Sequence, residues 1–105
     1  MLINTTWKAR PLSKAQTAAM MSLWAKLEAD LAGDPSMERL CWYMNADGSG
    51  GYSVARVIDS GAAAAFGLEL GLALGEFLEL ESKIVLELDD AMPAIMRAME
   101  RINAV

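Results

Sequence analysis

The residue in this sequence best suited to a chemical role is Arg56, a charged side chain inside a run that otherwise predicts a buried strand. Alternation over residues 52–59 places it on one face with three others: Tyr52, Val54 and Ile58. If that face is covered, the guanidinium needs an anionic partner, because an unpaired buried charge is costly. Three carboxylates on or beside a later predicted strand are candidates: Glu79, Glu81 and Glu87. The sequence therefore predicts either an interfacial salt bridge or a group that binds a ligand anion.

Further polar and aromatic residues are candidates to join Arg56 in a small-molecule site. Asn4 and Thr6 share one face of the first predicted strand, and Trp42 is expected to face the same space. An apolar cavity with a few convergent polar groups is the usual composition of such a site. The candidate ligand-binding residues are therefore Asn4, Thr6, Trp42, Tyr52, Arg56, Glu79 and Glu81. Alternation alone does not establish which way the first two strands face, and no catalytic base is identifiable.

Residues suited to metals and cofactors are scarce in this chain. It has no histidine, which is the usual ligand of haem and zinc, and its one cysteine excludes an internal disulfide. Cys41 has no cationic neighbour in sequence that would activate its thiol, so we expect a buried structural residue. The run 45–48 has two oxygen ligands of a calcium loop but lacks the third, and is expected to form a hairpin turn. We therefore predict no metal site and no cofactor.

Composition limits the partners that the chain can have. The 105 residues carry a formal charge of −5, which repels phosphate backbones and anionic lipid, so we expect neither nucleic acid nor a membrane as a partner. The sequence starts without a signal-peptide pattern, and the apolar stretch 61–78 is interrupted by Glu69 and Glu76. We expect one domain over residues 1–105, in the cytoplasm. Apolar residues make up 54% of the chain, and this excess predicts contact with a second subunit.

Patterning predicts the order β-α-β-β-α-β followed by a terminal helix. Strands are expected over 2–9, 38–44, 52–59 and 77–88. Helices are expected over 14–32, where Ser13 and Gln16 form a capping-box pattern, from about 61 to 74, and after residue 90. Gly67 and Gly71 lie in the second helix and Gly75 follows it, and this spacing suggests close approach to the sheet or to a partner.

This element order is that of the α+β, ferredoxin-like fold with a four-stranded antiparallel sheet. Two helices cover one face of such a sheet and leave the other bare. Because the second and third strands are apolar on both faces, we expect a second copy of the chain to cover the bare face. Two sheets meeting face to face would enclose a barrel-like space.

Three segments give the chain a more specific resemblance. The runs 2–7, 51–59 and 80–86, the last followed by a terminal helix, resemble the dimeric α+β barrel superfamily, and in particular its small bacterial members of unknown function. That superfamily includes cofactor-independent monooxygenases, haem-degrading enzymes, polyketide cyclases, relatives of chlorite dismutase and non-enzymatic members. Haem-binding members and many cyclases use a histidine, which this chain lacks.

The resemblance implies a homodimeric barrel that binds a small apolar or aromatic organic molecule between its two sheets. Such a protein could act as a cofactor-independent monooxygenase, since enclosure and hydrogen bonding can support that chemistry without histidine. Two alternatives stay open at this point. The dimer could bind or sense a ligand without turnover, or side chains could fill the barrel and leave a structural or interaction module.

Overall fold

The computed structural model describes residues 1–104, which form four strands and three helices. The strands are β1 (Leu2–Ala9), β2 (Met37–Met44), β3 (Gly50–Val57) and β4 (Leu78–Val85). The helices are α1 (Lys14–Ala32), α2 (Ser60–Leu74) and α3 (Leu88–Asn103). The strands make one antiparallel sheet in the order β2-β3-β1-β4. The predicted α+β, ferredoxin-like arrangement is confirmed.

Local signals in the sequence explain where the first two helices begin. The Gln16 backbone amide donates to Ser13 Oγ at 3.1 Å, and the Ser13 amide donates to Gln16 Oε1 at 2.9 Å, which completes the predicted capping box. At the start of α2, the Asp59 carboxylate accepts hydrogen bonds from the amides of Gly61 and Ala62. Each cap satisfies amides that have no partner within the helix.

The largest boundary error concerns the last strand, which was expected to run to residue 88 and ends at Val85. Leu86 and Leu88 continue the alternation of the strand, but Leu88 is already the first residue of α3. Asp89 and Asp90 lie in the first turn of that helix, where carboxylates interact favourably with the helix dipole. The expectation that these aspartates precede the helix was therefore wrong.

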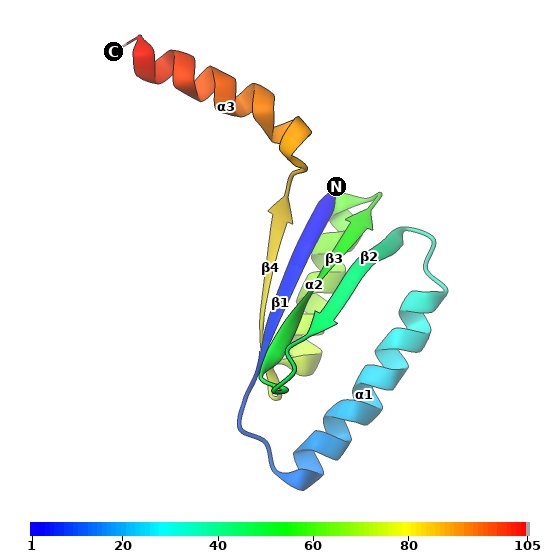
Figure 1. Ribbon diagram of the computed structural model, residues 1–105. Coiled ribbons are helices and arrows are strands. Elements are labelled where there is room, and N and C mark those ends of the chain that lie inside the picture. Colours follow the sequence, from blue (N-terminus) through cyan, green and yellow to red (C-terminus); the bar gives the residue numbers. More distant parts are fainter. Residues whose placement is uncertain (105) are drawn as a thin grey trace.

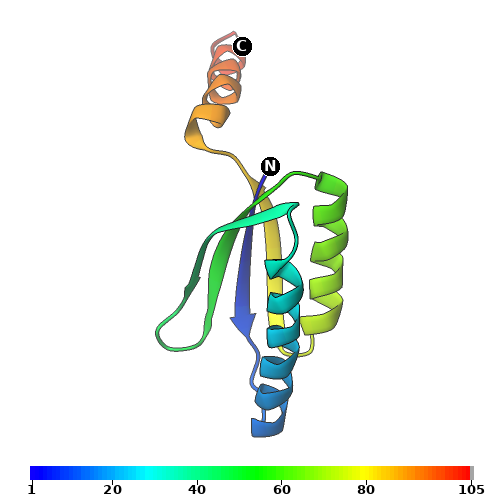
Figure 2. The ribbon, with the colours of Figure 1, turned by 90° about the vertical axis from the view of Figure 1, so that its right-hand side faces the viewer.

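Both α1 and α2 lie on the same side of the sheet, and no helix within residues 1–104 lies against the opposite face (Figure 2). The most buried cluster consists of Leu74, Phe77 and Leu78, where α2 turns into β4. Side chains of β1 and α1, including Trp7, Trp24 and Leu27, pack around it. Val57 and Ala63 are buried as well. The helix-covered face is therefore buried at both ends of the sheet, with the larger cluster where α2 leads into β4.

The terminal helix α3 extends away from the rest of the chain (Figure 1). The radius of gyration is 17.2 Å, whereas a compact domain of this length has a radius of about 13 Å. Five apolar side chains recur at helical spacing and are all exposed by 41–71%: Met92, Ile95, Met96, Met99 and Ile102. No other helix or strand within residues 1–104 packs closely against this apolar stripe.

Candidate functional site

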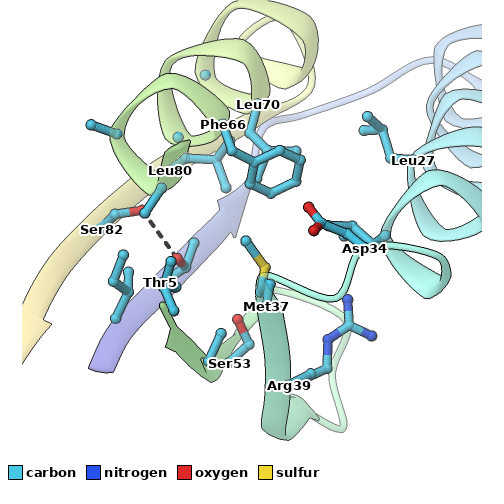
Figure 3. A pocket seen from close by; sticks show the side chains of 18 of the residues that line it. Thr5, Leu27, Asp34, Met37, Arg39, Ser53, Phe66, Leu70, Leu80 and Ser82 are labelled. Atoms are coloured by element: carbon cyan, nitrogen blue, oxygen red, sulfur yellow. Dashed lines mark hydrogen bonds between the residues drawn. The ribbon is translucent and has the colours of Figure 1, made fainter. Parts of the chain in front are cut away.

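A cavity of about 820 Å³ lies between the sheet and the two helices that cover it (Figure 3). Phe66 and Leu70 of α2 form one wall, and Leu27 of α1 contributes to another. The floor is the helix-facing side of the sheet, with Ile3 and Leu80 among its residues. Most of the lining is apolar. The volume falls within the range of about 300–1,000 Å³ that is typical of small-molecule sites.

Three tryptophans from three different elements meet at one side of the cavity. Trp7 lies on β1, Trp24 on α1 and Trp42 on β2. The centroid of the Trp7 ring is 6.2 Å from that of Trp24 and 6.2 Å from that of Trp42. Trp24 and Trp42 stack with a centroid distance of 5.3 Å. A Cβ at Gly51 would lie 2.6 Å from the Trp7 ring, so glycine is needed there for the ring to cross β3. The cluster offers large flat aromatic surfaces.

The charged groups beside the cavity are already partnered within the chain. The Arg39 guanidinium donates to both carboxylate oxygens of Glu28, at 2.6 and 3.1 Å, and lies 4.4 Å from the centre of the Trp42 ring. The Ser36 hydroxyl and amide donate to Asp34 at 2.6 and 2.9 Å, and these hydrogen bonds lower the pKa of that carboxyl. Asp34 is therefore a weaker base than an ordinary aspartate.

Two glycines on α2 line the cavity and leave space in it. A Cβ added at Gly67 or Gly71 would meet no atom within 4 Å, apart from near neighbours in its own helix. The expectation that these two glycines mark close helix–sheet contact was therefore wrong. Gly75 differs, because a Cβ there would come within 2.6 Å of the Gly71 carbonyl oxygen.

The cavity contains one of the seven candidate residues named from the sequence. Trp42 lines it, whereas the other six lie on the outer face of the sheet: Asn4, Thr6, Tyr52, Arg56, Glu79 and Glu81. On that outer face, Thr6 lies between Tyr52 and Glu81 on the neighbouring strands. The expectation that Trp42 shares a space with Asn4 and Thr6 was wrong. A β-bulge between Arg39 and Cys41 reverses the facing of the residues that follow it in β2.

Arg56 does pair with a carboxylate, but none of the three named candidates is its partner. Its guanidinium donates to Glu38 Oε2 at 3.2 Å, and the two side chains are 51% and 66% exposed. The reason is strand order: β2 lies beside β3 and sets Glu38 opposite Arg56, whereas β4 is separated from β3 by β1. Glu79 pairs instead with Arg10, and Glu81 with Lys83.

Sequence reasoning missed three hydroxyl residues in the cavity floor: Thr5, Ser53 and Ser82. A signal was present for Ser82, because it interrupts the apolar face formed by Leu78, Leu80 and Ile84. A hydroxyl in the middle of an apolar strand face suggests a specific use. Which face of the sheet Thr5 and Ser53 occupy depends on how the strands pair, and this could not be predicted from the sequence.

Within residues 1–104, no group of three or more histidine, cysteine, aspartate or glutamate side chains is arranged to hold a metal ion. None of the helices in that same range combines the length and the apolar character needed to cross a bilayer.

The sequence matches no protein-family model, and the search of curated proteins found no significant match. The assignment of the α+β, ferredoxin-like fold therefore rests on the order and pairing of the strands and helices.

We expect the variant Arg56→Leu to change the free energy of unfolding by less than about 1 kcal/mol, because solvent-exposed ion pairs contribute little. Chemical denaturation of wild type and variant measures this difference. A loss of about 3–5 kcal/mol would contradict the exposed setting and show that a second molecule covers this part of the outer face.

We expect Gly67→Ala and Gly71→Ala each to raise the free energy of unfolding by as much as about 1 kcal/mol, because alanine favours the helix and the added methyl group meets open space. The same denaturation experiment tests this. Gly75→Ala is the matched comparison, and should destabilise the protein because its Cβ collides with backbone. Destabilisation by alanine at 67 and 71 would mean that the helix closes on the sheet there.

Proposed function

We propose that this protein binds a small apolar or aromatic organic molecule in the cavity between its sheet and helices α1 and α2. One observation carries the proposal: a cavity of about 820 Å³ with mainly apolar walls, bordered by three tryptophan rings. Flat aromatic walls and a few polar groups suit an aromatic ligand in both shape and chemistry.

The two cavity glycines support a role for the open space itself. In a helix interior, each glycine costs about 1 kcal/mol relative to alanine. Alanine would fit at Gly67 and Gly71 without collision. Compared with alanine at these two positions, glycine therefore gives a less stable helix and a larger cavity. A trade of stability for open volume is expected of a binding site and is not expected of a core that only has to be filled.

The charged groups favour binding over proton-transfer catalysis. A general base works best when its pKa lies near the working pH, whereas the pKa of Asp34 is lowered by its hydrogen bonds to Ser36. Glu28 is engaged by Arg39 on both oxygens. We therefore favour ligand binding without turnover. Cofactor-independent oxygenation, which the resemblance to the dimeric α+β barrel superfamily implies, stays a prediction.

Naphthalene is a suitable apolar probe for this proposal. We expect titration calorimetry to show saturable binding to wild type, and Gly67→Leu to abolish it, because a leucine side chain there extends into the cavity. Ala65→Leu places the same side chain on the exposed side of α2 and is expected to bind naphthalene like wild type.

Absence of saturable naphthalene binding to folded wild type would contradict the proposal, as would equal binding by the Gly67→Leu and Ala65→Leu variants. Incubation of a bound aromatic probe under oxygen, followed by mass spectrometry, addresses turnover. A product with an added oxygen atom that forms with wild type and not without protein would show that the protein is a monooxygenase and not only a binding protein.

We also propose that the protein is a homodimer in which α3 packs on a second copy of the chain. Burial of the exposed apolar stripe of α3 against a second chain would stabilise the protein. The helix is joined to β4 through Leu86 and Glu87. A helix of this length is about 24 Å long and about 10 Å wide. Two such helices, each lying on the other copy, bury on the order of 1,000 Å² when both surfaces are counted, which is the lower limit for a specific interface. Direct contact between the two sheets stays a prediction.

Sedimentation at micromolar concentration should give about twice the chain mass of 11.3 kDa. Met96→Glu is expected to shift the protein to monomer, because it places a charge in the apolar stripe. Ala94→Glu adds the same charge on the opposite side of α3, since two residues correspond to about 200° of rotation, and should remain dimeric. A monomeric wild type would contradict the proposal.

A further inference from the structure

Three hydroxyl side chains form a straight row across the floor of the cavity. Thr5, on β1, is directly opposite Ser53, on β3, and directly opposite Ser82, on β4. All three line the cavity (Figure 3). Since neighbouring strands are about 4.8 Å apart, the row spans about 10 Å. The three residues are far apart in sequence, and only the pairing of the strands brings them together.

The row is bordered on both sides by apolar side chains. Ile3, Ala55 and Ile84 form the neighbouring row in one direction. Trp7, Gly51 and Leu80 form it in the other. Phe66 and Leu70 of α2 lie across the cavity from the floor (Figure 3). A polar line thus crosses an otherwise apolar surface, half-buried at Thr5 and Ser53 and exposed at Ser82, on the side of the sheet where a purely structural core would have apolar residues.

These hydroxyls have hydrogen-bonding capacity to spare. Thr5 Oγ1 and Ser82 Oγ are 3.0 Å apart and share one hydrogen bond. The Ser53 hydroxyl makes no hydrogen bond to any residue in the range 1–104. Each hydroxyl offers one donor and two acceptor positions. One donor and three acceptor positions of the bonded pair, and every position of Ser53, therefore remain for a molecule in the cavity.

We infer that this row binds a hydroxyl or carbonyl oxygen of a neutral and otherwise apolar ligand, such as a phenol or an aromatic ketone. The inference rests on the proposed binding function and specifies its ligand class. An ionised ligand group would need a charged partner, because a charge is costly to bury against apolar walls. The row itself carries no charge. Hydroxyls can donate to a carbonyl oxygen and can either donate to or accept from a phenol.

The aromatic part of the ligand has a place beside the same row. Trp42 is directly opposite Ser53 on the neighbouring strand, so the row of hydroxyls ends at the tryptophan cluster. A ring that stacks on this cluster can direct an oxygen substituent along the floor toward Ser53 and Thr5. A molecule of two or three fused rings with one oxygen substituent matches this arrangement.

Titration calorimetry with 2-naphthol and naphthalene tests the inference, because the two probes differ by one hydroxyl. The measured quantity is the ratio of their dissociation constants. In Thr5→Val and in Ser53→Ala, we expect the preference for 2-naphthol to fall by about two- to tenfold relative to wild type, the effect of one lost hydrogen bond. Naphthalene affinity should stay close to that of wild type in both variants.

Thr6→Val is the matched comparison, with the same substitution one residue further along β1 and on the outer face of the sheet. It should leave the probe ratio unchanged. If naphthalene binds but the ratio is the same in wild type, Thr5→Val and Ser53→Ala, the hydroxyl row does not recognise the ligand, while the binding function stands. A fall in the ratio for Thr6→Val alone would place the ligand on the outer face and overturn the inference. If neither probe binds wild type, the proposed function fails first.

Discussion

The contact between the three tryptophans determines how α1 lies over the sheet, and the cavity depends on it. Trp24 is the α1 residue that meets Trp7 and Trp42 on the sheet, with centroid distances of 6.2 and 5.3 Å. Indole rings are large and rigid, so they act as spacers as well as apolar contacts. Together with the buried cluster of Leu74, Phe77 and Leu78, they secure the helix layer at one part of the sheet. The remaining space between the layers is the cavity.

The cavity combines features that weaken a core and favour a binding site. Gly67 and Gly71 lower the helix propensity of α2 while leaving space beneath it. Thr5 and Ser53 place hydroxyls where apolar side chains would contribute more to stability. A natural protein commonly departs from the most stable arrangement where function requires it. These departures converge on one location, which is why we assign function there rather than to the outer face.

Much of the fold could be predicted from the sequence, because local signals determine its elements. The capping box at Ser13 and Gln16 and the alternation of Leu78 and Leu80 with Glu79 and Glu81 each act within a few residues. The site could not be predicted in the same way. The β-bulge after Arg39 changes the facing of Trp42, and strand order gives Arg56 the partner Glu38. Both depend on tertiary pairing, which alternation within a single strand does not contain.

The proposed function requires that the space between the sheet and the helices is an open cavity that accepts apolar molecules. A crystal structure determined under xenon pressure tests it directly, because xenon enters apolar cavities without needing any polar partner. We expect xenon density between Phe66 and Leu70 on α2 and the floor formed by β1 and β4. A crystal structure with α1 and α2 closed onto the sheet, and no xenon between them, would contradict it.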